Sequence, residues 1–407
     1  MVKQSSWTKW HGKEFILKAL PGTTDTGSSL EKSSMKSIVI DKDIPNLKGV
    51  FEKYCDVTYL KGQMIDRKAV KNADALIIRT RTKASRELLE NSSIKFIATA
   101  TAGFDHIDTE FCKSEGIRWA HAPGCNSFSV MQYLAAALAH LSEKHNFKFG
   151  EKTLGIIGVG HVGAKVAKMA RILGFRVLLN DPPRARKEGM KEFVALETIL
   201  KESDLVSLHV PLNLIGQDKT LELCNEDFIS GLKKGAIIIN TSRGEVVVEK
   251  ALIKSLKSGH IKGAVLDVWG QEPGIDPALV GLVDIATPHI AGYSADGKAL
   301  GSSMVVQALS RYFKLGLDKW QAKNLVGTDN MEIGFDENQS RNPLGHAIFS
   351  TYPIMKDHEP FVKDISKFEY LRNNYPVRRE FPAYTINPSM LARETISKLY
   401  ALGFRTY

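Results

Sequence analysis

Residues 153–173 read TLGIIGVGHVGAKVAKMARIL, and this stretch decides the fold. It starts with a short apolar run, continues with the pattern Gly158-Val-Gly160-His-Val-Gly163, and ends in a run with helical periodicity. A strand, a glycine turn and a helix in this order open a dinucleotide-binding βαβ unit. Gly158 permits the tight turn, Gly160 lets the backbone approach a pyrophosphate, and Gly163 lets helix and strand pack closely. The alternative is a tight turn that binds nothing.

Asp181 ends the next apolar run, 23 residues after Gly158. A carboxylate at this place accepts hydrogen bonds from both ribose hydroxyls and repels a 2′-phosphate, which favours NAD over NADP as the cofactor. Arg184 and Arg186 follow closely, and they keep NADP open as the alternative.

The strand at 153–158 is the first of a series. Further apolar runs lie at 176–181, 204–210, 236–240, 263–268 and 283–288. Strands that are apolar on both faces need helices on both sides of their sheet. We therefore assign residues 132–290 to a doubly wound Rossmann NAD-binding domain.

A separate βα series precedes it. Strand-like runs at 36–40, 74–79 and 95–100 alternate with helical stretches expected at 44–54 and 86–91. An Ala/Leu-rich helix at 130–143 bridges the two series, and a helix at 292–316 returns to the first. Residues 35–131 and 291–316 are therefore expected to form a separate domain with its own doubly wound parallel sheet.

The two ends of the chain have a different texture. Residues 1–34 lack periodicity and have no long apolar stretch, so we interpret them as a tag or a disordered arm. Residues 317–407 are expected to form a small α+β domain, with helices at 360–374 and 388–402. The predicted fold class is thus α/β, with two doubly wound domains and a C-terminal addition.

The composition is that of an average globular protein. Of 407 residues, 43% are hydrophobic and 25% charged, and this length predicts two or three domains. Its apolar runs fall short of the roughly 20 residues that span a bilayer, so no membrane partner is expected. The net charge of +10 is spread evenly along the chain, which argues against nucleic acid and favours small anionic ligands.

Three polar residues follow successive strands of the second series: Arg243, Glu272 and His289. Open α/β sheets bind ligands at this edge. Arg243 is suited to hold a substrate carboxylate, and His289 to exchange a proton with a substrate hydroxyl, while Glu272 fixes the tautomer of His289. Each residue alone is as readily a cap or a surface charge. Together, beside a dinucleotide site, they predict hydride transfer from a 2-hydroxy acid.

The cysteines add no further chemistry. The chain has four cysteines that lie far apart without a CxxC pair: Cys55, Cys112, Cys125 and Cys224. We therefore expect neither a disulfide framework nor a metal site, and we expect a cytoplasmic location. Cys125 is interpreted as packing, since hydride transfer needs no covalent nucleophile.

Four stretches resemble the D-isomer-specific 2-hydroxyacid dehydrogenase family: the glycine motif, NTSRG (240–244), LDVWGQEP (266–273) and PHIAGY (288–293). The resemblance implies that residues 35–131 and 291–316 form a substrate-binding lid domain and that catalysis takes place in a cleft between it and the NAD domain. It implies that Arg243 binds substrate, Glu272 assists and His289 is the general acid or base.

A narrower resemblance covers residues 35–407. ATATAGFDH (98–106), APGCN (122–126), NDPPR (180–184), FEYLRNNYPVRREF (368–381) and KLYALGF (398–404) are similar to a branch of the family with a C-terminal dimerisation domain and a small phosphorylated 2-hydroxy acid as substrate. It implies a homodimer formed through residues 317–407.

This resemblance also implies individual contacts. The substrate contacts are Thr80, Thr101 and Tyr293. The cofactor contacts outside the motif glycines are His161, Val162, Asp181, Val210 through its backbone, Thr241, Ser242, Arg243, Asp267 and Gly292.

The loop RTRTK (79–83) supports a phosphorylated substrate independently. Arg79, Arg81 and Lys83 alternate after a strand, so they share one face and supply positive charge. The alternative is a solvated basic loop. Arg378 and Arg379 are further basic residues, and one hypothesis has them reach the site of a neighbouring subunit.

Two other functions remain open. A D-3-phosphoglycerate dehydrogenase, or another D-2-hydroxyacid dehydrogenase, has a similar substrate, but the tail lacks the βαββαβ pattern of an amino-acid-binding regulatory domain. An NAD-sensing, corepressor-like binding protein would keep the fold and lose catalysis, against which the intact Arg243, Glu272 and His289 argue.

Overall fold

Strand β6 (Thr153–Ile157) lies inside a six-stranded parallel sheet of order β11-β10-β9-β8-β6-β7. The other strands are β7 (Arg176–Asn180), β8 (Leu205–Leu208), β9 (Ala236–Asn240), β10 (Ile261–Leu266) and β11 (Ile285–Ala286). The chain runs from β6 to β7 and then returns to β8 on the other side of β6. This reversal confirms the doubly wound sheet and places a ligand crevice at the carboxyl ends of β6 and β8.

Helices cover both faces of this sheet. They are α5 (His161–Leu173), α6 (Pro182–Glu188), α7 (Leu196–Glu202), α8 (Glu226–Gly231), α9 (Glu249–Ser258) and α10 (Pro277–Val280). In β9, Ile237 and Ile239 join the hydrophobic cluster that contains α5, and Ile238 joins the cluster on the other face. The alternation explains why the strands are apolar at every position.

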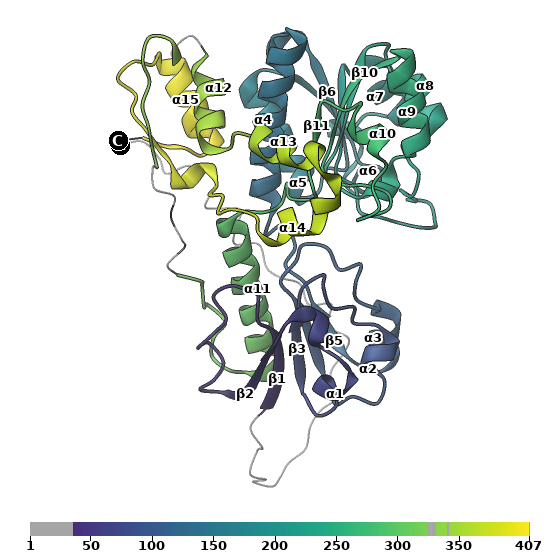
Figure 1. Cartoon of the computed structure of the whole chain (residues 1–407), viewed down its shortest axis with the longest axis vertical. Helices are drawn as coiled ribbons and strands as arrows, with labels where there is room; N and C mark the ends of the chain where they lie inside the picture. The colour runs from purple at the N-terminus through teal and green to yellow at the C-terminus, as the bar shows by residue number, and fades with distance from the viewer. Residues whose placement is uncertain (1–35, 324, 326, 328–330, 340–341, 407) are drawn as a thin grey trace.

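The second lobe holds a five-stranded parallel sheet of order β2-β1-β3-β4-β5. Its strands are β1 (Lys36–Asp41), β2 (Cys55–Leu60), β3 (Ala75–Ile78), β4 (Phe96–Thr99) and β5 (Arg118–Ala120). Short helices α1 (Arg67–Val70), α2 (Arg86–Leu89) and α3 (Thr109–Ser114) contribute to the core on one face. The structure describes residues 36–323, 325, 327, 331–339 and 342–406 of this computed structural model (Figure 1). The predicted arm at 1–34 lies outside them.

The expected helix at 44–54 is wrong. Ile44, Leu47 and Phe51 are buried at a spacing that mimics a helix, but the segment consists of turns. Asn46 and Gly49 adopt φ values of 64° and 84°, which a right-handed helix does not contain. The turns deliver three apolar side chains to the sheet without helical hydrogen bonding.

Helices α4 (Ser127–His145) and α11 (Ala295–Phe313) connect the lobes, as predicted. α4 is one unbroken helix in the core of the cofactor lobe, and α11 covers the free face of the five-stranded sheet through Val305, Val306 and Leu309. Short 3-10 helices lie at Gly62–Met64, Phe149–Glu151, Met190–Glu192, Gly244–Val246, Ile365–Lys367 and Phe381–Ala383.

The C-terminal segment is packed onto the cofactor lobe. It holds β12 (Glu332–Ile333), β13 (Thr385–Ile386), β14 (Arg405–Thr406), α12 (Pro343–Thr351), α13 (Met355–Lys363), α14 (Phe368–Asn373) and α15 (Arg393–Leu402). Phe361 and Phe368 join the cluster of Trp269, and the Phe361 and Trp269 ring centroids are 5.8 Å apart. The amide of Ala286 donates to His358 Nδ1 at 3.0 Å, so α13 covers the edge strand β11.

Figure 1 shows α14 at the junction of the two lobes, beneath α5 and above the five-stranded sheet. Within the described residues, no helix is long and apolar enough to cross a membrane. All four cysteines are buried and free.

A buried polar cluster joins the segments that cross between the lobes. Ser129 in α4 and Ser294 at the start of α11 both donate to Glu380 Oε1, at 2.8 and 2.9 Å. Burial, together with the charge of Asp296, raises the pKa of Glu380 to about 7, against the opposing effect of the two serine hydrogen bonds. Between about pH 4.5 and pH 7, Glu380 is therefore protonated in the folded protein and ionised in the unfolded chain.

This proton makes stability depend on pH. The contribution of Glu380 is full below about pH 4.5 and is lost as the pH rises through about 7. Relative to Glu380→Gln, which cannot ionise, the wild-type free energy of unfolding should fall by about 1 kcal/mol per pH unit between about pH 5 and 7. Urea unfolding across this range measures the difference, with exposed Glu359→Gln as control. Parallel wild-type and Glu380→Gln curves would show that Glu380 is ionised in the fold.

Candidate active site

The glycine loop leaves the start of α5 open. Gly158 has φ of +84°, and a Cβ there would lie 2.5 Å from the carbonyl oxygen of His209. A Cβ at Gly163 would lie 2.0 Å from the carbonyl oxygen of Gly158. Gly160 begins α5 without a side-chain cap, and a Cβ there would meet nothing within 4 Å. The first N–H groups of α5 thus face accessible space, which fits the pyrophosphate of a dinucleotide.

Asp181 ties this loop to α6. Its carboxylate accepts from the amide of Val159 at 2.8 Å and from the amide of Arg184 at 3.0 Å. Each carboxylate oxygen keeps a lone pair for a ribose hydroxyl. Asp181 is 8% exposed, so its carboxylate is largely shielded from solvent.

The two arginines that left NADP open are paired elsewhere. Arg184 binds both carboxylate oxygens of Glu188, at 2.9 and 2.6 Å, and Arg186 binds Asp218. Neither is an uncompensated charge beside Asp181, which supports NAD.

His289 and Glu272 form a pair at the carboxyl edge of the sheet. His289 Nδ1 lies 3.0 and 2.8 Å from the two carboxylate oxygens of Glu272. Burial alone would raise the pKa of Glu272, but the hydrogen bond and charge of His289, the amide of Trp269 and the charge of Arg372 hold that pKa below its ordinary value. An ionised carboxylate only accepts, so Nδ1 carries the proton and Nε2 is left for a substrate.

Asp267 fixes the backbone that carries His289. Its carboxylate accepts from the amides of Ile290 and Ala291, at 2.8 and 2.9 Å, and from Thr287 Oγ1 at 2.6 Å. Burial raises the pKa of Asp267 to about 6. His289 itself has φ of 57°, a left-handed conformation that this loop has to impose.

Arg243 reaches across to the other lobe. Its Nη2 and Nε donate to Asp105 at 2.6 and 3.1 Å, and its Nη1 donates to the carbonyl of Ser242 at 2.8 Å. A Cβ at Gly103 would lie 2.2 Å from Arg243 Nη2, so only glycine lets the guanidinium approach this loop. Arg243 therefore lies beside the backbone that follows β4.

The turn before Arg243 is organised by Asn240. Its side chain accepts from the amide and hydroxyl of Ser242, at 3.0 and 2.8 Å, and donates to the carbonyl of Arg243. Thr241 Oγ1 is buried without a hydrogen-bond partner in the described part of the chain, which marks it as a polar group available to a ligand.

The other predicted cofactor residues lie along the same edge. The ring of His161 would be 2.7 Å from a Cβ at Gly124, and Val162 packs on the core at the start of α5. Val210 follows β8 next to Gly158, and Gly292 packs on Asn126. The carboxylate of Asp267 is turned toward the His289 loop.

The RTRTK loop is arranged differently from the prediction. Arg79 binds Asp41 at 3.0 Å and Asp43 at 3.1 Å within its own lobe. Arg81 instead binds Glu369 and Asn373 of α14. The three cations therefore do not form one free basic face.

The predicted substrate residues lie around this loop. Thr80 is exposed at its tip, and Thr101 Oγ1 donates to the carbonyl of Gly103 at 2.8 Å, next to Arg243. Tyr293 accepts from Arg372 Nη2 at 3.4 Å. The burial of Cys125 raises the pKa of its thiol to about 12, which agrees with a packing role.

Sequence reasoning missed Asp105 and Arg372. Arg378 is 5% exposed and donates to the carbonyls of Ile290 and Ala291, at 3.3 and 2.6 Å, in its own chain. Arg379 binds Asp296 at 2.9 Å. Both side chains are thus engaged within the chain, and their reaching a neighbouring subunit stays a prediction.

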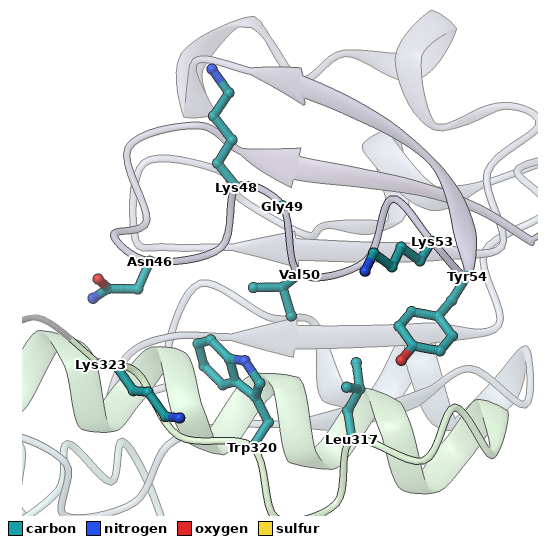
Figure 2. Close-up of a pocket in the computed structure, with 9 residues that line it drawn as sticks. All are labelled: Asn46, Lys48, Gly49, Val50, Lys53, Tyr54, Leu317, Trp320 and Lys323. Carbon is teal, nitrogen blue, oxygen red and sulfur yellow. The ribbon is translucent and has the colours of Figure 1, made fainter.

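A separate cavity of about 490 Å³ lies away from these residues. Figure 2 shows Trp320 and Leu317 on one side of it and Val50, Lys53 and Tyr54 on the other. None of the predicted site residues lines it.

Known proteins match the chain over most of its length. A family model of the NAD-binding domain of D-isomer specific 2-hydroxyacid dehydrogenases matches residues 133–291. Erythronate-4-phosphate dehydrogenase of Bacteroides thetaiotaomicron is 47% identical over 86% of this chain and 98% of its own length. The Photorhabdus laumondii protein of that name is 38% identical over 91% of this chain and 99% of its own length.

A solved structure shares the two-lobed fold. D-lactate dehydrogenase from Aquifex aeolicus, complexed with NAD and lactic acid, aligns with a TM-score of 0.60 and 27% identity over 72% of this chain and 100% of that one. The geometry and these matches agree. The chain belongs to the D-isomer-specific 2-hydroxyacid dehydrogenases and, within them, to the erythronate-4-phosphate dehydrogenase family.

Proposed function

We propose that this protein oxidises 4-phospho-D-erythronate at C2, with NAD, to (R)-3-hydroxy-2-oxo-4-phosphobutanoate in pyridoxal 5′-phosphate biosynthesis. The observation that carries the proposal is the His289–Glu272 pair at the edge of the sheet that bears the open glycine loop. The names of the matching relatives support this substrate.

Proton transfer falls to His289. When bound, NAD supplies the acceptor for the hydride from C2. As the hydrogen at C2 leaves with its electron pair, the hydroxyl proton passes to His289 Nε2 and the C2–O bond becomes a carbonyl. Glu272 holds Nδ1–H and stabilises the imidazolium that forms.

Arg243 positions the substrate. A planar guanidinium matches a carboxylate with two parallel hydrogen bonds. Asp105 holds two of its nitrogens in this structure, so substrate binding has to replace that carboxylate with its own. The Gly103 backbone beside it forms the opposite wall of the carboxylate site.

The test of His289 uses Asn because residue 289 has a positive φ, which Asn tolerates better than Ala. In His289→Asn, kcat should fall by about 10²- to 10⁴-fold, since general base catalysis is lost. NAD affinity, measured by fluorescence titration, should stay within about twofold of wild type because α5 is untouched. Near wild-type turnover would remove His289 as the base.

The substrate is tested by NADH formation at 340 nm with a panel of 2-hydroxy acids. We expect 4-phospho-D-erythronate to give the highest kcat/KM, above D-3-phosphoglycerate and above unphosphorylated acids. A preference for D-3-phosphoglycerate would favour the phosphoglycerate alternative. NAD binding without turnover of any acid would favour a sensing protein.

We further propose that the chain works as a cytoplasmic homodimer formed through residues 317–407. The cytoplasmic location is supported by the four cysteines, which are buried and form no disulfide. The dimer is supported by two large hydrophobic side chains that the C-terminal segment exposes, Tyr370 and Met390. Light scattering on the purified protein should give twice the 45.1 kDa chain mass. A monomer at micromolar concentration would contradict the dimer.

A further inference from the structure

Two arginines and a tyrosine converge where α14 meets the RTRTK loop. Arg81 comes from that loop, Arg372 from α14, and Tyr293 from the segment after His289. Arg372 Nη2 donates to the hydroxyl of Tyr293 at 3.4 Å, and Arg81 Nη2 donates to Asn373 Oδ1 at 2.9 Å. Three separate parts of the chain thus place polar groups at one point.

The cluster carries more positive than negative charge. Glu369 is the carboxylate it contains: one oxygen binds Arg81, and the other lies 3.8 Å from Arg372 Nη1. Arg372 is 13% exposed, and its buried Nε has no hydrogen-bond acceptor among the described residues. Lys298 Nζ lies 4.8 Å from the centroid of the Tyr293 ring and is the third cation of the cluster, after Arg81 and Arg372. Glu369 therefore lies between two guanidinium groups, and the Nε of Arg372 is left without an acceptor among the described residues.

This cluster adjoins the catalytic pair. Tyr293 lies four residues after His289, and the charge of Arg372 acts on the carboxylate of Glu272. The substrate proposed above carries its phosphate two carbons from C2, on the side opposite its carboxylate. With C2 at His289 and the carboxylate at Arg243, the phosphate has to lie away from Arg243.

We propose that Arg81, Arg372 and Tyr293 form the subsite for the terminal phosphate of the substrate, with Arg372 as a specificity residue supplied by the C-terminal segment. The inference rests on the function proposed above. The phosphate takes the place of the Glu369 carboxylate between the two guanidinium groups, and it accepts from the unused Nε of Arg372. Guanidinium groups suit this role because their N–H forks match phosphate oxygens.

Two other basic residues near the site are less suited to bind the phosphate because acidic or backbone groups already hold them. Arg79 is already neutralised by Asp41 and Asp43, and Arg378 is committed to the backbone of the His289 loop. Glu369 keeps the subsite occupied in the absence of substrate.

The test compares Arg372→Gln with Arg372→Lys, and with Arg393→Gln as a matched control, an exposed arginine elsewhere in the C-terminal segment. In Arg372→Gln, kcat/KM for 4-phospho-D-erythronate should fall about 10- to 100-fold, the usual effect of losing hydrogen bonds to a charged group. Turnover of unphosphorylated D-erythronate should fall much less, because that substrate lacks the group that Arg372 is proposed to bind. Arg372→Lys should restore part of the loss, and Arg393→Gln should behave as wild type.

Glu369→Gln provides a second, independent test. Removing the competing carboxylate should lower the inhibition constant of inorganic phosphate, whereas Arg372→Gln should raise it. The same order should appear in the rise of Tm that inorganic phosphate causes, a readout that needs no turnover. Failure of the wild type to oxidise 4-phospho-D-erythronate would overturn the proposed function, while the Tm measurements would still decide the anion subsite.

Equal losses on the phosphorylated and unphosphorylated substrates in Arg372→Gln would overturn the subsite, because the residue would then act on structure or catalysis. Unchanged or weaker phosphate inhibition in Glu369→Gln would also overturn it.

Discussion

Hydrogen bonds of Asp267 and Arg378 hold the peptide backbone of Ile290 and Ala291, and the geometry of the candidate active site depends on them. Asp267 accepts both amide hydrogens, and Arg378 donates to both carbonyl oxygens. Both side chains are buried, so their hydrogen bonds do not compete with water. These hydrogen bonds hold the backbone of His289 in a left-handed conformation. Its Nδ1 then contacts Glu272, and its Nε2 is left for a substrate.

The hydrogen bonds of Arg378 also link the C-terminal segment to the candidate active site. Arg378 belongs to that segment, whose aromatic side chains Phe361 and Phe368 are buried in the cofactor lobe. Three contacts also cross to the five-stranded lobe: Arg243 with Asp105, and Arg81 with both Glu369 and Asn373. The C-terminal segment therefore has contacts with both lobes next to the His289–Glu272 pair.

The central strands and the residues that follow them can be predicted from the sequence, because they depend on short stretches of the chain. Continuous apolar runs predict the central strands. Arg243 and His289 are candidates because each follows a strand closely and parallel strands end at one edge of the sheet. β2 was missed because it is an edge strand with mostly partly exposed residues, and β5 because it has three residues. The turns at 44–54 imitate a helix in spacing alone.

The partners of the site residues could not be predicted in the same way. Asp105 lies 138 residues from Arg243, and Glu369 lies 288 residues from Arg81, so only the folded chain brings them together. Arg79 and Arg81 look alike in sequence, yet one is neutralised within its lobe and the other faces α14. Which basic residue is free to bind a ligand is decided by acidic neighbours that are distant in sequence.

The proposed oxidation requires that the hydrogen at C2 of the substrate passes directly to the cofactor as a hydride. The most direct measurement uses 4-phospho-D-erythronate carrying deuterium at C2, with mass spectrometry of the NADH formed in ordinary water. We expect one deuterium in each NADH molecule and a slower reaction than with the unlabelled substrate when the chemical step limits turnover. NADH without deuterium would show that the C2 hydrogen is lost to solvent and would rule out direct hydride transfer.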